Sequence, residues 1–289
     1  MTHRVTAVGG GHGLAASLDA LKRLTPDVTA VVSVADDGGS TGRLRDAFHV
    51  PAYGDLRKAI LALAAPDSGL ASAMAHRFDE GDLDGHAFGN LLIAAMAQVG
   101  GDLVAALDEI VALTNGVGRV LPAVSDWVVL HGRTSGGDVV VGQARLCVTE
   151  HLRAVSVEPA DPDVPKETSD ALATADMIVL GPGSLYTSVL AAAVAPAVLR
   201  GIQESPAPLV YVCNLRPQRA ESSGYSVADH VDALRRHGLA PDVVLFDRDQ
   251  MGAADRVPGA TAASLARSNG LAHDPVKLAA AFESLDVWT

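Results

Sequence analysis

The feature that most constrains this chain is a short apolar strand that runs directly into a cluster of glycines. Val5 to Val8 are apolar, and they are followed by Gly9-Gly10-Gly11-His12-Gly13. Leucines then recur at helical spacing as far as Pro26, and the β-branched run Val28 to Val34 predicts a second, buried strand. A strand, a glycine loop, a helix and a second strand in this order open a doubly wound sheet.

The rest of the chain continues this alternation with two interruptions. Residues 56–114 have a helical pattern almost throughout, whereas residues 117–157 alternate apolar and polar residues between glycine turns. The later predicted strands are Met177 to Leu180, Leu209 to Cys213 and Val243 to Phe246. The later predicted helices are Ser184 to Ile202, Val227 to Arg236 and Lys277 to Leu285. We therefore predict a single Rossmann-like α/β domain over residues 1–289, with a mostly parallel sheet, a helical insertion and a small antiparallel β insertion.

Composition narrows the classes of protein that fit. Only 4% of the 289 residues are aromatic, so the core must consist mainly of Ala, Val and Leu. A net charge of −12 without a Lys/Arg-rich run argues against a nucleic-acid partner. Cys147 and Cys213 stand beside apolar residues, which predicts buried, reduced thiols. Without a signal-peptide core or a membrane-length apolar run, we expect a cytoplasmic protein with no membrane insertion. The sequence leaves open whether the chain forms a homo-oligomer.

The first glycine loop is a candidate phosphate site. Its amides can approach a phosphate closely, and the helix that follows adds favourable partial positive charge. The dinucleotide fingerprint fits poorly, because Leu14 and Ala15 stand where its last glycine belongs, so NAD is a weaker alternative. The candidate contacts are Gly10, Gly11, His12 and Gly13.

A second polar, glycine-rich loop, Asp36 to Gly42, follows the second strand. An acidic residue there could hold a ribose hydroxyl, and paired carboxylates could instead hold Mg²⁺. Arg43 and Arg45 could pair with phosphate oxygens. The candidate contacts are Asp36, Asp37, Gly38, Gly39, Ser40 and Arg43, joined by Gly54, Asp55 and Arg57 of the next segment. Asp55 either caps a helix or shares a Mg²⁺ ion with Asp37.

Two further loops open helices. In Gly85 to Asn90, His86 acts either as a hydrogen-bonding residue at the helix start or as a catalyst, and Asn90 is a further candidate contact. Leu180 to Ser188 follows a strand, and its free amides form a ready anion site. Ser184 lies outside any nucleophile-elbow pattern, so phosphate binding is favoured over acyl-enzyme chemistry. The candidate contacts in this loop are Gly181, Pro182, Gly183, Ser184, Tyr186 and Thr187.

These loops, in this order, resemble the gluconeogenesis factors (YvcK-like proteins), a family related to 2-phospho-L-lactate transferase (CofD-like proteins). The matching runs, which span nearly the whole chain, are Val8 to Gly13, Ser33 to Arg45, Gly54 to Lys58, His86 to Asn90, Leu180 to Ser188, Tyr211 to Asn214 and Gly224-Tyr225. The run Gly-Gly-Ser-Thr-Gly-Arg-Leu-Arg after Asp37 is similar to the gluconeogenesis-factor branch, and the Val-Ser-Pro-Asp-type run of the transferases is missing.

The resemblance implies a Rossmann-like fold, a UDP-sugar ligand such as UDP-N-acetylglucosamine, and Asn214 as a further site residue. It implies a regulator of cell-wall and central carbon metabolism that is required for cell shape or gluconeogenic growth. The absence of a coherent nucleophile–base pair favours a binding regulator without turnover. The alternatives are a Mg²⁺-dependent phospholactyl- or phosphoryl-group transferase and an NAD-dependent oxidoreductase.

The chain departs from the family pattern at three places. His12 stands where the family usually has Thr, and Tyr53 stands where it usually has Pro. Leu215 to Ser222 diverges from the usual Met-Thr-Gln-Pro-Gly-Glu-Thr stretch. The divergence over residues 215–222 puts in question which ligand group this segment binds, but not the presence of the site.

Overall fold

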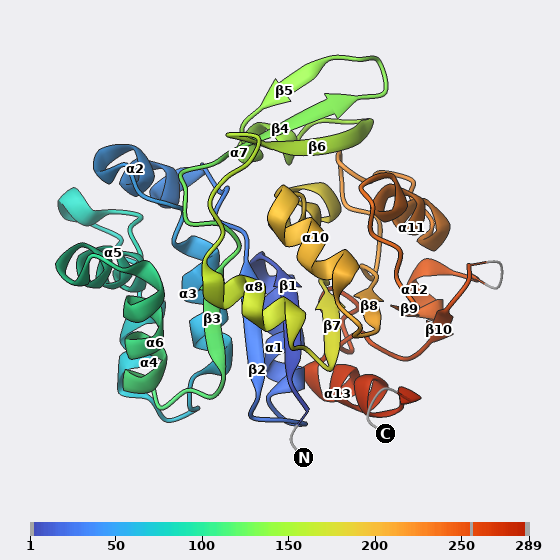
Figure 1. Cartoon of the computed structure of the whole chain (residues 1–289), viewed down its shortest axis with the longest axis horizontal. Helices are drawn as coiled ribbons and strands as arrows, with labels where there is room; N and C mark the ends of the chain where they lie inside the picture. The colour runs from blue at the N-terminus through green and yellow to red at the C-terminus, as the bar shows by residue number, and fades with distance from the viewer. Residues whose placement is uncertain (1–2, 255–256, 287–289) are drawn as a thin grey trace.

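A seven-stranded sheet forms the centre of the molecule in the computed structural model, which describes residues 3–254 and 257–286 (Figure 1). Its strands lie in the order β10-β9-β8-β7-β1-β2-β3, and every neighbouring pair is parallel. The strands are β1 (Val5–Gly9), β2 (Val28–Val32), β3 (Arg119–Pro122), β7 (Met177–Leu180), β8 (Leu209–Val212), β9 (Val243–Phe246) and β10 (Ala260–Ala262). The predicted doubly wound α/β fold is confirmed.

The strand order places a topological switch point between β1 and β7. From β1 the chain moves outward to β2 and β3, then returns to β7 on the other side of β1 and moves outward again. The connections leave the two sides of this pair in opposite directions, so a crevice opens at the carboxyl ends of β1 and β7. Ligands of doubly wound proteins bind in this crevice.

Helices cover both faces of the sheet. The helices α1, α3 and α13 pack together on one face, and α8 and α10 pack together in front of the sheet in Figure 1. The helices are α1 (Gly11–Leu21), α2 (Gly39–Phe48), α3 (Gly54–Leu63), α4 (Gly69–Ala75), α5 (Phe88–Gly100), α6 (Leu103–Leu113), α8 (Lys166–Ala173), α9 (Ala191–Ala193), α10 (Pro196–Glu204), α11 (Val227–Arg236), α12 (Arg248–Met251) and α13 (Pro275–Glu283), with a 3₁₀ turn η1 (Gly81–Leu83).

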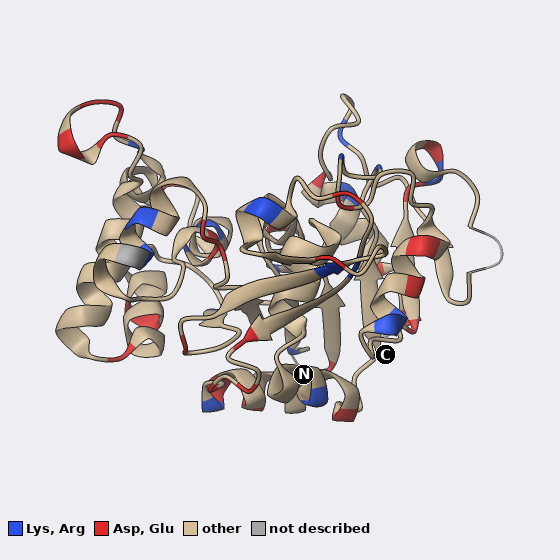
Figure 2. Ribbon diagram, turned by 90° about the horizontal axis from the view of Figure 1, so that it is seen from above, with Lys and Arg blue, Asp and Glu red and all other residues tan. Residues whose placement is uncertain are grey.

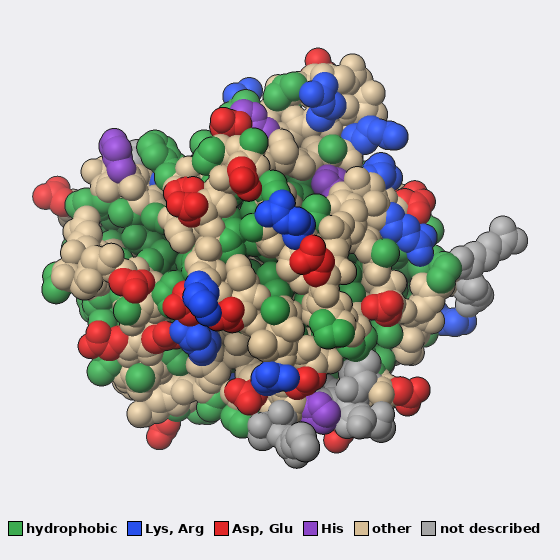
Figure 3. All heavy atoms as spheres, in the orientation of Figure 1, with side chains coloured by type: hydrophobic (Ala, Val, Ile, Leu, Met, Phe, Trp, Pro, Cys, Tyr) green, Lys and Arg blue, Asp and Glu red, His purple; other side chains and the backbone are tan. Residues whose placement is uncertain are grey.

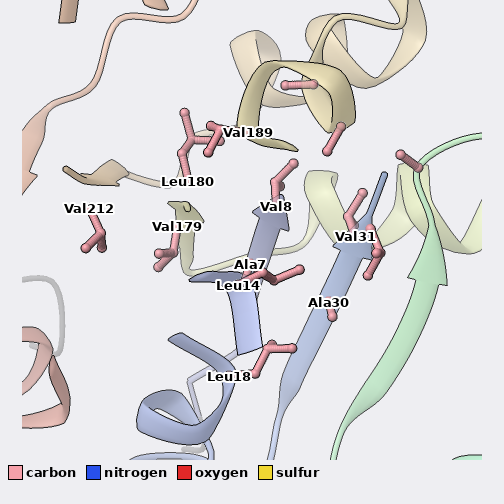
Figure 4. Close-up of a cluster of buried hydrophobic side chains, with 14 of the residues drawn as sticks. Ala7, Val8, Leu14, Leu18, Ala30, Val31, Val179, Leu180, Val189 and Val212 are labelled. Atoms are coloured by element: carbon pink, nitrogen blue, oxygen red, sulfur yellow. The ribbon is translucent and has the colours of Figure 1, made fainter. Parts of the chain in front are cut away.

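The core consists of small and branched aliphatic side chains, as the composition predicts. The first strand and helix contribute Val8, Leu14 and Leu18 to this core, the flanking strands contribute Val31 and Val179, and all are buried (Figure 4). Short side chains let α1 approach the sheet closely, and this close approach fixes where its amino end lies. Acidic and basic side chains are interspersed over the face shown in Figure 3.

A small antiparallel sheet lies over the carboxyl ends of the parallel strands (Figures 1 and 2). It has the order β5-β4-β6 and carries the short helix α7. Its elements are β4 (Val129–Thr134), β5 (Val139–Val141), α7 (Gln143–Leu146) and β6 (Leu152–Glu158). The backbone N–H of Ala144 donates to Asp37 Oδ1 at 2.8 Å, and Gln143 Nε2 donates to the carbonyl of Thr187 at 3.2 Å. The helix α7 therefore ties the small sheet to two loops below it.

Three boundaries differ from the sequence prediction. The helical insertion begins with α2 at Gly39, inside the expected loop, because the buried Arg45 donates to the carbonyls of Ala35 and Val128 and holds this helix. The predicted pairing of Arg45 with phosphate is therefore wrong. The strand β3, which the sequence placed in the antiparallel insertion, pairs parallel with β2, since an alternating pattern carries no information about direction.

The predicted helix from Ser184 to Ile202 is also divided. A π-helical turn η2 (Leu185–Leu190) leads into α9, and Pro196 then starts the separate helix α10. Among the described residues no single helix is long and apolar enough to span a membrane. The segments on either side of the Pro196 break pass that test only together, and they are bent by 78°.

We predict that Gly13→Ala destabilises the protein by about 3 kcal/mol, the upper end of the cost of overpacking. A Cβ at Gly13 would overlap the carbonyl of Pro182 and lie 2.8 Å from Gly183 Cα, so backbone would have to move. Gly69→Ala is the matched control, because no atom lies within 4 Å of a Cβ there. Urea unfolding of both variants measures the difference, and equal midpoints would contradict the close packing of the two loops.

Candidate functional site

Two glycine loops pack against each other at the switch point. The N–H of Gly181 donates to the carbonyl of Val8 at 3.0 Å, and Ser17 Oγ donates to the carbonyl of Gly181 at 2.8 Å. Gly13 lies against Pro182, as described above. The loops after β1 and β7, which the sequence singled out separately, therefore form one continuous surface.

The amino end of α1 remains open at this surface. Gly10 is the capping residue in an extended conformation, and no side chain caps the helix. Among the described residues, no partner is recorded for the N–H groups of Gly11, His12 and Gly13. These three donors, together with the helix dipole, favour a bound anion.

Charged side chains surround this helix end. Asp55 lies so close that a Cβ at Gly10 would be 2.5 Å from its Oδ2, and Lys58 Nζ is 2.9 Å from Asp55 Oδ1. Partial desolvation of the imidazole lowers the pKa of His12, although the residue is exposed, and the positive charge of Lys58 lowers it further. At neutral pH the imidazole of His12 is therefore an uncharged hydrogen-bonding group.

A cavity of about 660 Å³ extends from this charged group between α1, α3 and the segment before α13. Its polar lining is mostly cationic, although Asp19 also contributes. The side chains that can bear positive charge are His12, Lys22, Arg57, Lys58, Arg267 and His273. Burial lowers the pKa of His273 to about 4, so this imidazole is neutral. The cavity can hold the part of a ligand that leads away from the α1 amino end.

Asp36, and not Asp37, is the carboxylate that lies beside Gly54 and Asp55 at the start of α3. Asp36 Oδ1 accepts from the N–H of Gly38 at 2.9 Å, and its Oδ2 is 3.4 Å from the position of a Cβ at Gly54. Burial chiefly raises the pKa of Asp36, and the negative charge of Asp55 adds to the increase. Asp37 instead accepts from the Ala144 N–H of α7 and joins the small sheet to the loop.

Asp55 does not cap α3. It lies in the first turn of a helix whose capping residue is Tyr53, and its recorded partner is Lys58. Within residues 3–254 and 257–286, no group of three or more His, Cys, Asp or Glu side chains could hold a metal ion. Asp36 and Asp55 supply oxygen donors of the kind that Mg²⁺ prefers, so an ion there would need ligand phosphate and water to complete its coordination.

The third loop holds the helical insertion to the site. His86 Nδ1 and Ser40 Oγ are 2.9 Å apart, so His86 contacts the start of α2 instead of the start of its own helix. Arg57 Nε donates to Asn90 Oδ1 at 3.0 Å, and both side chains are buried. This pair joins α3 to α5. Arg43 is exposed and donates to the carbonyl of Asp84 at 2.7 Å.

The amino end of η2 is occupied by the protein's own carboxylate. Glu221 is 3% exposed, and its Oε2 accepts from Thr187 Oγ1 at 2.8 Å. Burial raises the pKa of Glu221, and its hydrogen bond with Thr187 and the nearby backbone of residues 185–187 lower it by less. Its Oε1 is buried without a hydrogen-bond partner among the described residues. Of the two amides that the sequence offers here, that of Gly183 already donates to Asn214 Oδ1, and ligand contact at the amide of Ser184 stays a prediction. The sequence analysis missed Glu221, although a lone carboxylate after two arginines was a usable signal.

Two other predicted contacts in this loop point into the protein. Tyr186 is fully buried, and its hydroxyl contacts Tyr225 Oη at 3.0 Å and Arg236 Nη2 at 3.3 Å. Thr187 is bonded to Glu221, and Cys147 Sγ donates to Thr187 Oγ1 at 3.5 Å. Both side chains therefore support the loop. The two cysteines are free thiols; Cys213 is buried as predicted, whereas Cys147 is only half-buried.

Gly183 and Asn214 connect the fourth loop to the end of β8. The N–H of Gly183 donates to Asn214 Oδ1 at 3.1 Å, and Asn214 Nδ2 is buried without a partner in the structure. Gly183 has φ +145°, which L side chains rarely adopt. Its side-chain-free backbone is therefore needed for conformation as well as for access.

Comparison with known proteins finds similar chains that share most of its length. A family model described as 2-phospho-L-lactate transferase CofD matches residues 5–278. The gluconeogenesis factor of Bacillus subtilis is 41% identical over 81% of this chain and 74% of its own length. That of Halalkalibacterium halodurans is 39% identical over 83% of this chain and 76% of its own length. A Deinococcus radiodurans relative is 39% identical over 98% of this chain, which covers 66% of the relative.

A solved structure is also closely similar. The crystal structure of a UPF0052 family member from Bacillus halodurans superposes with a TM-score of 0.92 at 33% identity. The match covers 98% of this chain and 99% of that chain. The fold, including both insertions, is therefore shared over nearly the full length of the two chains.

We predict that Glu221→Gln changes how stability depends on pH. Because the folded-state pKa of Glu221 lies above its usual value of 4.5, the unfolded chain releases this proton first as pH rises. Wild-type stability therefore falls from about pH 4.5 upward through the folded-state pKa, and glutamine removes this loss. Denaturant unfolding should show that the free energy of unfolding of the variant, relative to that of wild type, is higher at pH 8 than at pH 5. The exposed Glu204→Gln is the control, and parallel pH profiles would contradict the prediction.

Proposed function

The chain belongs to the gluconeogenesis factor family, which is related to 2-phospho-L-lactate transferase CofD, and from this premise we propose that it is a regulator that binds a nucleotide sugar of the UDP-N-acetylglucosamine type. In this proposal the protein acts in the cytoplasm on cell-wall and central carbon metabolism. Ligand occupancy, rather than turnover, carries the signal.

The observation that carries the proposal is the open amino end of α1 at the switch point. Three N–H groups there have no recorded partner in the part of the chain that the structure describes, whereas the buried Glu221 lies against η2 and accepts from Thr187. A diphosphate would accept hydrogen bonds from these amides and lie near Lys58. The adjoining cavity of about 660 Å³ is large enough for a further part of the ligand.

The same site offers little support for nucleophilic catalysis. Within the described ranges no side-chain hydrogen bond to a base is recorded for Ser184, and Thr187 is bonded to the buried Glu221. Cys147 donates to Thr187, and burial raises the pKa of its thiol. These groups support a binding site in which the ligand is held without forming a covalent intermediate.

A second candidate function is Mg²⁺-dependent transfer of a phosphorus-containing group. Two observations favour it: the CofD family match and the position of Asp36 beside the Asp55 segment, next to the α1 amino end. In this alternative Asp36 and Asp55 would hold Mg²⁺, which would neutralise charge on the transferred group. Turnover of an activated lactyl-phosphate donor with a deazaflavin acceptor would distinguish it from the regulator.

We predict that His12→Glu weakens binding of UDP-N-acetylglucosamine at least tenfold, or about 1.4 kcal/mol. A carboxylate in the first turn of α1 suits the helix dipole but repels a phosphate at the same amides. His12 is exposed, so the fold should persist, and His12→Gln is the uncharged control with a much smaller effect. Isothermal titration calorimetry measures both. No binding of any uridine nucleotide to wild type would overturn the proposal, and NAD binding alone would favour an oxidoreductase.

We predict for the transferase alternative that Mg²⁺ strengthens ligand binding through Asp36 and Asp55. Asp36→Asn and Asp55→Asn should each weaken binding in Mg²⁺ buffer and make little difference in EDTA, because neither form then holds the ion. Asp37→Asn is the control, since Asp37 accepts from the α7 backbone. A wild-type affinity that is the same in Mg²⁺ and EDTA would exclude the shared ion.

A further inference from the structure

The exposed aromatic side chains of this protein lie together at the carboxyl end of α2, on the periphery of the molecule (Figure 1). Phe48 is 49% exposed and Trp127 is 43% exposed. No other Phe, Tyr or Trp within residues 3–254 and 257–286 is exposed. His49 follows Phe48 in the chain, and the centroid of its ring is 5.6 Å from that of Trp127. We call Phe48, His49 and Trp127 the aromatic surface.

The core of the protein holds this surface in a fixed conformation. Arg45 lies under the indole of Trp127, with its guanidinium carbon 5.3 Å from the ring centroid. Arg45 is itself 2% exposed and donates to the carbonyls of Ala35 and Val128. A cation–π contact with a buried guanidinium leaves the indole little freedom to lose when another molecule packs against it. Aromatic side chains of this kind contribute much of the binding energy of protein interfaces.

Carboxylates without ion pairs lie beside the aromatic surface. Asp126 directly precedes Trp127, and its Oδ2 accepts from the backbone N–H of Asp163 at 2.7 Å. Asp161 belongs to the same segment, and both Asp161 and Asp163 are exposed. Among the described residues none of the three is recorded in an ion pair, whereas the next lysine in the chain already has an ion-pair partner. We call Asp126, Asp161 and Asp163 the acidic rim.

The charge of the acidic rim decides which occupant this surface fits. Nucleic acid and an anionic membrane surface would both be repelled by three unpaired carboxylates. A second copy of the chain, related by a two-fold axis, would place one acidic rim close to another. A basic polypeptide is attracted instead, and its apolar side chains can pack on the aromatic surface. An apolar centre beside a charged rim is the ordinary arrangement of a protein–protein interface.

We propose that the aromatic surface and the acidic rim bind a basic segment of a partner protein. An apolar side chain of that segment packs against Phe48 and Trp127, and its Lys or Arg side chains pair with the acidic rim. The inference goes beyond the proposed nucleotide-sugar site, because no residue of this surface belongs to the α1 amino end or to the adjoining cavity. Failure of one therefore leaves the other untouched.

The first test identifies the chemistry of the occupant with a phage-displayed library of short random peptides. The library is depleted on the variant Phe48→Ser/Trp127→Ser and is then selected on the wild-type protein. Enriched peptides should carry a net positive charge and at least one aromatic or large aliphatic residue. Acidic or purely polar peptides, or no enrichment over the unselected library, would overturn the inference. Thermal unfolding checks that the variant is folded.

The second test measures binding of one enriched peptide by fluorescence anisotropy. Trp127→Ser should weaken binding at least tenfold, which is typical of a central aromatic residue. Asp161→Asn/Asp163→Asn, which keeps the shape of both side chains, should weaken binding at least threefold at low salt. The effect should be much smaller at high salt, because added ions screen exposed charges. This double variant keeps the proposal testable if Trp127→Ser does not fold.

Two matched control variants are available in the helical insertion. Val99→Ser changes a valine that is 91% exposed, and Asp79→Asn/Asp82→Asn removes the same charge from two exposed positions. Both should bind the peptide as tightly as wild type. Equal weakening by the controls would show that surface charge or apolar exposure acts without a defined site, and would overturn the inference. A wild-type protein that dimerises in sedimentation equilibrium, while Trp127→Ser stays monomeric, would assign the surface to a second copy and overturn it too.

Discussion

The contact between Gly13 and Pro182 is the constraint on which the site depends. The loops after β1 and β7 leave the sheet at the point where the strand order reverses, and only a residue without a side chain fits between them. This packing fixes the amino end of α1 beside the fourth loop. The helix is therefore held by core contacts such as Leu14 and Leu18, while its first amides stay open at the surface of the crevice.

The amino ends of α1 and η2 meet at the switch point, but only the η2 end has a protein carboxyl group against it. The buried carboxyl group of Glu221 accepts from Thr187 in η2, whereas no side-chain cap is recorded for α1 among the described residues. The α1 end therefore attracts an anionic ligand more strongly than the η2 end. The carboxylate of Asp55 lies beside Gly10 at the α1 end and pairs with Lys58, and that of Asp36 lies beside Gly54.

The insertions support the site. The pair Arg57–Asn90 joins α3 to α5, and the Asp37 contact with the Ala144 N–H holds α7 of the small sheet over the second loop. Several polar residues near the site therefore have partners within the protein. Asn214 is different, because its Oδ1 accepts from the N–H of Gly183 while its Nδ2 has no partner among the described residues.

Local patterns in the sequence determined the strands Met177–Leu180 and Val243–Phe246, the glycine loops and the aliphatic core, because strand period, turn chemistry and composition are properties of neighbouring residues. Long-range contacts decided the rest. Residues distant in the chain decide the parallel direction of β3 and the burial of Arg45 and Tyr186. They also decide that Asp36, and not Asp37, lies beside Gly54, and that Glu221 packs against η2. A sequence shows that a polar group needs a partner, but only the tertiary structure shows whether the protein already supplies it.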